Sequence, residues 1–469
     1  MYKILRSSLA VAVLAVPLAA FAQGDGFGMP ARNGVQLPVV KNMPSVSFSW
    51  KADSKTSLFH NRGAGLAKGS TTYGETEGLR ELAHLGVDAK AGSASFHAGA
   101  ILQGYEWTGN AHGADTPAYP NQVTGISSNA IRLDYAYMET PIADGWIFSA
   151  GRQIVNWGYC FTACDTRRDR LKLVKVINPH WVYVTLWDKR DAQTLRSAAN
   201  SKYPVGDYRS GYMWLNGFVA NFEPGMDSAI HIGSFISIFR GNSATGANAN
   251  AANSTVGSGF ALRGVDLWSS WARGHVQGWQ YLANLNVTKN GSVLWPDTSE
   301  AYALRVAHDL ASPKWNLAGQ YIGVHNGGLI SSGYDTFSSM VNNSPAMDTS
   351  PTNVTNLGGT GIKGVSQYKQ WMAMVRLSWM PTQKWTLNLA GGRMHRDGSA
   401  GALNFAQGTT ENDNVVDVQA HYQISPNVRT WATWGMLDPT NSGTAPMFQG
   451  TGYTGSSIQA VSLNVQAVF

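Results

Sequence analysis

The last twelve residues of the chain, Ile458 to Phe469, alternate between apolar and polar side chains and end on an aromatic residue. In an extended strand, successive side chains point to opposite sides, so this stretch has one apolar face and one polar face. The apolar face carries Val461, Leu463, Val465 and Ala467, and the polar face carries Ser462, Asn464 and Gln466. Such a strand is typical of the wall of a transmembrane β-barrel. An edge strand of a soluble sheet is the alternative.

Residues 1–22 have the organisation of a secretory signal peptide. Two basic residues precede the apolar run Leu9 to Ala20, and Ala20-Phe21-Ala22 has the small-aromatic-small form of a cleavage site. The run is shorter than the ~20 residues that a spanning helix needs. We therefore expect export, with residues 23–469 as the mature protein. No comparable apolar run follows, so a membrane location would require strands.

The composition fits a sheet protein with Gly-rich turns and aromatic girdles. Charged residues make up only 14% of the chain, which contains 51 Gly, 17 Trp, 18 Tyr and 16 Phe. The net charge of +6 is spread over 469 residues without a dense Lys/Arg run, so we expect no nucleic-acid partner. Cys160 and Cys164 are the only cysteines. In an exported protein they are expected to form a disulfide, because two ligands do not make a zinc site.

Short turns and long connections alternate along the mature chain. Tight turns rich in Gly, Pro, Asn and Asp are predicted at residues 91–93, 143–145, 178–180, 223–227, 273–274, 312–314, 381–384 and 425–427. Long connections are predicted at residues 108–128, 241–257, 326–365, 397–412 and 438–455. Short turns on one side and long loops on the other are typical of outer-membrane barrels. The sequence therefore predicts one antiparallel barrel domain over residues 23–469, with about 18 strands, or about 16 as the alternative.

The chain resembles Gram-negative outer-membrane porins. The resemblance rests on the segment Gly151-Arg152-Gln153-Ile154-Val155-Asn156-Trp157-Gly158, which is similar to a G-R-Q…N-W-G segment of loosely characterised porin-like families. The segments Asp169 to Lys172 and Asp188 to Arg190 are similar to the hairpin that follows it there, and the terminal Phe469 is similar to the closing residue of such barrels. The resemblance implies a pore in the outer membrane, in contact with its lipid, and a homotrimer by analogy. It leaves the transported solute open.

The connection Trp157 to Arg170 is a further loop, which by the same resemblance corresponds to the third loop of porins and would fold into the lumen and narrow it. Charged residues at such a constriction set ion preference. The candidates are Asp165, Arg167, Arg168, Asp169 and Arg170. A disulfide between Cys160 and Cys164 would stiffen this loop. The alternative is a surface loop whose charges are solvated.

Basic residues on the polar faces of the strands are a second signal. Arg132, Asp134, Arg305 and Arg376 share a face with polar neighbours, and Arg152, Arg263 and Arg429 are further lumen-facing candidates. Arg on the lipid face would cost roughly 2 to 4 kcal/mol at mid-membrane, so an interior position is favoured. A cationic interior favours anionic solutes. Acidic residues predicted on the same face, such as Asp134, could instead pair with these arginines.

The sequence predicts no enzyme, no catalytic residue, no metal site and no cofactor. It contains no G-x-S-x-G, H-E-x-x-H or C-x-x-C-H motif. Residues 359–364 match G-x-G-x-x-G but lie in the longest loop, so we interpret them as a flexible loop. We expect an outer-membrane porin for passive diffusion of small hydrophilic, anionic solutes. A barrel that sheathes a multihaem cytochrome and an outer-membrane enzyme are the two alternatives.

Overall fold

The computed structural model describes residues 46–63, 74–106, 132–190, 211–225, 228–240, 265–289, 298–310, 314–331, 333–342, 352–353, 355–358, 369–397, 410–439 and 457–469. The chain divides into two compact units, Met1–Val46 and Ser47–Phe469. Apart from Val46, the first unit lies outside the described residues, and so does the expected signal peptide. Cleavage after Ala22 therefore stays a prediction. The second unit is the barrel.

The described residues form 18 β-strands. The first nine are β1 (Val46–Gly63), β2 (Gly74–Ala91), β3 (Ala94–Glu106), β4 (Arg132–Ala143), β5 (Trp146–Trp157), β6 (Ala163–Val176), β7 (Trp181–Arg190), β8 (Gly211–Gly225) and β9 (Ser228–Arg240). The other nine are β10 (Val265–Val276), β11 (Trp279–Lys289), β12 (Thr298–Asp309), β13 (Trp315–His325), β14 (Lys369–Thr382), β15 (Trp385–Asp397), β16 (Thr410–Ser425), β17 (Val428–Pro439) and β18 (Ile458–Val468). The expected strand number of 18 is confirmed.

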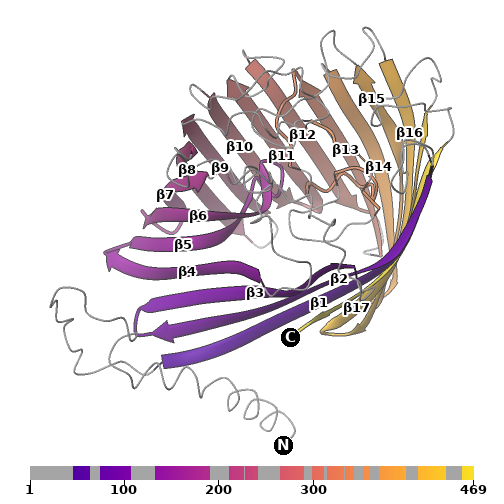
Figure 1. Ribbon diagram of the computed structural model, residues 1–469. Coiled ribbons are helices and arrows are strands. Elements are labelled where there is room, and N and C mark those ends of the chain that lie inside the picture. The colour runs from indigo at the N-terminus through magenta and orange to yellow at the C-terminus, as the bar shows by residue number, and fades with distance from the viewer. Residues whose placement is uncertain are drawn as a thin grey trace, which may run out of the picture. The chain divides into compact units, whose positions relative to one another are not determined.

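The sheet closes on itself because the first and last strands pair. Each strand is hydrogen-bonded to its neighbours in sequence, and β1 pairs antiparallel with β18, with Leu58 opposite Leu463. A closed cylinder has no unpaired edge, which is what a spanning sheet requires. Figure 1 shows the strands following one another around the barrel in chain order. Within the described segments there is no apolar helix of membrane-spanning length.

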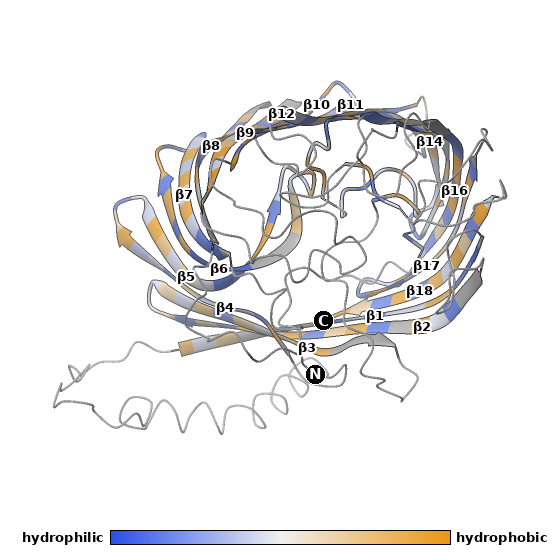
Figure 2. Ribbon diagram, turned by 45° about the horizontal axis from the view of Figure 1, so that its top comes forward, coloured by the Kyte–Doolittle hydropathy of each residue, from blue (hydrophilic) through white to orange (hydrophobic). Residues whose placement is uncertain are grey.

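The two faces of the wall differ in chemistry as the alternation predicts. On β18, Leu463 is 52% exposed on the outside and Asn464 is 3% exposed on the inside. Further outward apolar side chains are Leu58, Leu133, Leu171, Trp214, Ile236, Trp268, Leu304, Val375, Leu389 and Val418. The alternation of hydropathy along the strands is visible in Figure 2. A greasy outer band and a polar interior are the pattern of a transmembrane barrel.

One predicted turn is wrong. Arg273 and Gly274 belong to β10, and the chain reverses four residues later at Gln277 and Gly278. These two residues have φ values of +48° and +80°, as a tight two-residue hairpin turn requires. Gln rarely adopts a positive φ, so the residue pair Gln277-Gly278 was not recognised as a turn from the sequence. The correction moves Arg273 from a turn into the barrel wall.

Candidate functional site

The end of the β5–β6 hairpin leaves the barrel wall. Strand β5 pairs with β4 only as far as Arg152, and β6 pairs with β7 only from Asp169 onward. Between these points the described strands pair only with each other. We call residues 153–168 the inner hairpin. Figure 2 shows it inside the ring of strands.

Polar side chains on β10 and β11 hold the tip of the inner hairpin. Asn284 Nδ2 donates a hydrogen bond of 2.7 Å to the carbonyl oxygen of Gly158. Thr162 Oγ1 donates to Asn286 Oδ1 at 2.8 Å and lies 2.6 Å from Ser269 Oγ. All three wall residues are buried. The inner hairpin therefore extends from β5 and β6 across the lumen to β10 and β11, and it occupies part of the lumen.

The turn of the inner hairpin has an unusual backbone. Gly158, Tyr159 and Cys160 have φ values of +61°, +54° and +69°. A disulfide joins Cys160 to Cys164 across the turn. This conformation brings the Tyr159 ring against the guanidinium of Arg273 on β10, 4.9 Å from ring centroid to Cζ.

A second segment, residues 326–342, also lies against the inside of the wall; we call it the inner loop. Its apolar side chains pack on inward-facing residues of β12 to β18. This buried cluster includes Ile330, Tyr334, Phe337 and Met340 of the loop and Ala303, Ile322, Met372, Met374, Met394 and Val415 of the wall. The inner loop contacts the inner hairpin directly, since Ser331 N donates to Phe161 O at 2.8 Å. The two segments thus form one lumenal structure.

Asp335 ties the inner loop to β12. Its Oδ2 lies 3.1 Å from Arg305 Nη1, and Arg305 Nη2 donates to the backbone oxygen of Asp335. Desolvation alone would raise the pKa of this carboxyl, but Arg305, Arg376 and the N–H of Phe337 outweigh it and hold the pKa below its ordinary value of 3.8. Asp335 is therefore ionised at neutral pH. Burial raises the pKa of the adjacent Tyr334 to about 12, so its phenol is neutral.

Phe337 lies between two guanidinium groups of the wall. Its ring centroid is 4.5 Å from Arg305 Cζ and 4.1 Å from Arg376 Cζ. A guanidinium over an aromatic face is attracted electrostatically and keeps its edge N–H groups free to donate. Phe337 thus orients both arginines without neutralising them.

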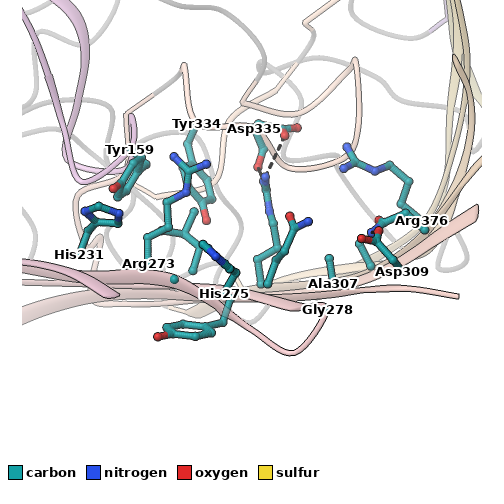
Figure 3. A pocket seen from close by; sticks show the side chains of 17 residues that line it. Tyr159, His231, Arg273, His275, Gly278, Ala307, Asp309, Tyr334, Asp335 and Arg376 are labelled. Atoms are coloured by element: carbon teal, nitrogen blue, oxygen red, sulfur yellow. Dashed lines mark hydrogen bonds and ion pairs between the residues drawn. The ribbon is translucent and has the colours of Figure 1, made fainter. Parts of the chain in front are cut away.

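Beside these arginines, a cavity of about 870 Å³ lies between the inner face of strands β9 to β14 and the two lumenal segments; we call it the recess. Residues that line it include Tyr159, His231, Arg273, His275, Gln280, Arg305, Asp309, Asn316, Tyr334, Asp335 and Arg376. Figure 3 shows Tyr334 and Asp335 of the inner loop facing the strands, with Arg273 and Arg376 on either side. Both lumenal segments and six strands, β9 to β14, therefore contribute to one site.

The charges around the recess are not balanced. Among the described residues, only Arg305 of its three arginines forms an ion pair with a carboxylate, that of Asp335. Arg273 and Arg376 are each stacked on a ring, and Arg376 Nε is buried without a hydrogen-bond partner there. Asp309 accepts a hydrogen bond of 2.8 Å from Asn316. The recess therefore presents guanidinium groups that can take an anion.

Of the five constriction candidates, Arg170 is the best defined. Its Nε and Nη2 donate to the two carboxylate oxygens of Asp188, each at 2.8 Å. Arg170 and Asp188 are 3% and 1% exposed, and the guanidinium lies 5.7 Å from the ring of Trp157. Here the structure departs from the expectation, because this arginine is neutralised and does not present a free cation to the lumen.

The other four candidates lie on the same strand. Asp169 is on the face opposite to Arg170, is exposed, and lies 3.8 Å from Arg152 across the β5–β6 ladder. Arg168 is half-buried. The side chains of Asp165 and Arg167 lie outside the described part of the chain. Their role at a constriction stays a prediction.

Three of the wall arginines assigned to the lumen from sequence face inward. Arg305 and Arg376 line the recess. Arg429 on β17 donates from Nε to Gln466 Oε1 at 2.8 Å and lies 5.1 Å from the ring of Trp431. It is exposed on the inner face and is not among the residues that line the recess.

Of the remaining lumen assignments, Arg152 is half-buried and lies 3.8 Å from Asp169, and the others fall at a β-bulge or outside the described residues. Asp134 is buried at a β-bulge, where the ladder between β3 and β4 shifts register and Leu133 and Tyr135 take opposite faces. Because of the bulge, Tyr135 is buried while Leu133, two residues before it, is exposed. The side chain of Arg132 and the whole of Arg263 lie outside the described residues.

Sequence reasoning missed part of this site. Arg273 was hidden by the wrong turn, and His275 carries no motif. The inner loop was recognised only as the longest connection. The usable signal was on the facing strand, where Met372 and Met374 share the inward face with Arg376 and need an apolar cover inside a polar lumen.

No protein-family model and no curated protein matches the chain. Solved structures do. OccAB2 of Acinetobacter baumannii has a TM-score of 0.54 at 10% identity, over 90% of this chain and 98% of that one. OccK9 (OpdG) of Pseudomonas aeruginosa gives the same values, and OccAB3 of A. baumannii gives 0.52 at 9% over 90% and 99%. At these identities the likeness concerns the fold alone, a closed antiparallel β-barrel.

Proposed function

We propose that this protein is an outer-membrane channel for passive diffusion of small hydrophilic solutes, with a preference for anions at the recess between β9 and β14. The observation that carries the proposal is the pair Arg273 and Arg376, each stacked on an aromatic ring and unpaired with any described carboxylate. A guanidinium with free edge N–H groups matches the geometry of carboxylate and phosphate oxygens.

Passage requires that binding be weak enough for release. Asp335 and Asp309 lie among the lining residues and offset part of the positive charge. A solute anion would exchange water for guanidinium contacts and leave again without a conformational step. Mixed charge at the site therefore supports diffusion rather than tight capture.

The cytochrome sheath is less well supported. A multihaem partner would need a wide, empty lumen. The inner hairpin is instead tied to β11 through Asn284, and the inner loop is tied to β12 through Arg305. Two anchored segments in the lumen leave a narrower passage, suited to small solutes.

One hydrogen-bonded chain favours the enzyme alternative. His97 Nδ1 lies 2.6 Å from Asp88 Oδ1, and His97 Nε2 lies 2.9 Å from Ser95 Oγ. A serine hydrolase also needs a pair of N–H groups for the oxyanion, whereas the backbone beside Ser95 belongs to the ladders with β2 and β4. Asp88 in addition binds Lys51 at 3.3 Å. We therefore assign the hydrogen bonds among Asp88, His97 and Ser95 a structural role in the barrel wall. Hydrolysis of p-nitrophenyl acetate that disappears on Ser95→Ala would overturn that assignment.

Reversal potentials across a planar bilayer with a KCl gradient test the proposed selectivity. The wild type should prefer Cl⁻, and the double variant R273Q/R376Q should lose most of this preference because the recess loses its uncompensated charge. Arg393→Gln is the matched control, since Arg393 is exposed and alternates with the buried Met394 on β15. A cation-selective wild type, or a double variant with an unchanged reversal potential, would refute the anion preference.

A further inference from the structure

The inner loop has a second anchor, on the opposite side of Phe337 from Asp335. Ser339 donates from both its backbone N and its Oγ to Asp417 Oδ2 on β16, each at 2.6 Å. Gln419 Nε2 donates to the other carboxylate oxygen at 2.8 Å. Asp417 is 1% exposed and Ser339 is fully buried. The carboxylate is therefore held mainly by donors from the loop, and it does not face the solute.

The wall is shaped to receive the loop at this point. Gly435 on β17 lies opposite Asp417 in the ladder. A Cβ on Gly435 would lie 2.7 Å from Met340 Cγ and 2.9 Å from Ser339 Oγ. These distances are shorter than van der Waals contact, so only a glycine leaves room for the loop to seat on Asp417.

Between the two anchors the backbone is strained. Phe337 has a φ of +63°, a left-handed conformation that bulky residues rarely adopt. Such a conformation persists only where the surroundings fix it. On one side Asp335 Oδ1 accepts the N–H of Phe337 at 3.0 Å, and on the other side Asp417 holds Ser339. The same residue carries the ring that lies over Arg305 and Arg376.

We propose that Asp417 is a positioning residue that sets the selectivity of the recess without contacting the solute. By holding Ser339 it fixes Phe337, and Phe337 fixes the direction in which the guanidiniums of Arg305 and Arg376 present their N–H groups. The inference rests on the proposed anion preference and adds a determinant outside the recess, since Asp417 and Ser339 do not line it.

Two substitutions of Asp417 separate positioning from charge. Asp417→Asn keeps an oxygen that can accept both bonds from Ser339, and a flipped Gln419 amide can accept from the new NH₂ group. Asp417→Ala removes the anchor. Both remove one negative charge, so charge alone predicts the same rise in anion preference for the two variants. Positioning predicts that Asp417→Asn keeps or raises the wild-type Cl⁻/K⁺ permeability ratio, whereas Asp417→Ala lowers it by about threefold or more.

A third variant unseats the loop without changing any charge. Gly435→Val should lower the Cl⁻/K⁺ ratio in the same direction as Asp417→Ala. The matched control is Gly319→Val, because a Cβ on Gly319 would have no atom within 4 Å. Heat-modifiable mobility on gels and a β-type circular dichroism spectrum show that each variant is a folded barrel.

The outcomes distinguish failure of the positioning role of Asp417 from failure of the proposed function. If the wild type prefers anions and both Asp417→Ala and Gly435→Val keep its ratio, the positioning role is wrong and the proposed function stands. Equal ratios for Asp417→Asn and Asp417→Ala would also refute positioning. If the wild type has no anion preference, the selectivity part of the proposed function fails, and the positioning role of Asp417 fails with it.

Discussion

Two arginines on the inner side of the barrel, Arg170 and Arg376, have opposite surroundings. Arg170 makes a two-pronged ion pair with Asp188 and is almost fully buried. Arg376 is stacked on Phe337, faces the recess, and has no ion pair with a described carboxylate. The same residue type therefore has two roles, one in joining strands β6 and β7 and one in a site open to the lumen.

The difference shows what an inward arginine implies. Alternation along a strand predicts only the face, and both residues satisfy it. Whether the charge is available to a solute depends on a partner from another strand or loop. For Arg170 the partner is a carboxylate on the adjacent strand, and for Arg376 it is the ring of a residue far away in sequence.

The largest expected effect is on stability at the paired arginine. Arg170→Met leaves the Asp188 carboxylate buried without its cation. Breaking a buried ion pair in this way costs about 3–5 kcal/mol. Thermal unfolding of the detergent-solubilised barrel, followed by circular dichroism, should show a clearly lower midpoint.

The matched control replaces both partners. Arg170→Met with Asp188→Leu removes the unpaired charge, so much of the stability should return. Arg376→Gln should leave the midpoint close to that of the wild type. Arg376 forms no ion pair with a described carboxylate, so its removal leaves no buried carboxylate without a partner. Equal loss of stability in Arg170→Met and Arg376→Gln would erase the distinction between the two arginines.

A smaller effect is expected at Asp335, which offsets part of the charge of the recess. Asp335→Asn should increase the preference for Cl⁻ over K⁺ at neutral pH. The pKa of Asp335 is below its ordinary value of 3.8, so its charge, and the stability it gives to the loop, are present above that value and are lost as the pH falls through the lower folded-state pKa. The difference in reversal potential between wild type and variant should therefore persist down to about pH 4 and vanish only in stronger acid. A difference that vanishes between pH 7 and 5 would contradict the pairing with Arg305.

The smallest expected effect concerns the turn that carries Tyr159. The Cys160–Cys164 disulfide closes a very short loop, so replacing both cysteines by serine should lower the free energy of local opening of this turn by about 2 kcal/mol. We expect the opening to be local, because Asn284 and Asn286 still hold the tip. Faster cleavage at this turn by a protease, with an unchanged unfolding midpoint of the barrel, would agree. A large fall in the barrel midpoint would show that the hairpin end supports the wall.

The sequence predicted the features that depend on local alternation. The 18 strands, the greasy face of β18 and the inward directions of Arg305 and Arg376 all follow from a period of two. Where the alternation breaks, the predictions fail. At Asp134 a bulge interrupts the alternation, so Tyr135 is buried while Leu133 is exposed. The turn after β10 lies at Gln277 and Gly278, so the strand continues past Arg273.

The lumenal segments were harder to predict because their contacts are distant in sequence. Thr162 contacts Asn286, and Ser339 contacts Asp417, across gaps that no local pattern encodes. The resemblance to porins drew attention to the connection Trp157 to Arg170 alone. The site also depends on the inner loop, for which the inward Met372 and Met374 were the one available sign.

Access to Arg376 from the lumen tests the account most directly. The variants Arg376→Cys and Val375→Cys place a thiol on adjacent residues of β14 that face opposite sides, since Val375 is 56% exposed on the outer wall. We predict that a water-soluble sulfonatoethyl thiosulfonate reduces the single-channel current of Arg376→Cys in discrete steps and leaves Val375→Cys unchanged. A current that is unaffected in Arg376→Cys, with modification verified by mass spectrometry, would mean that solutes do not pass this recess.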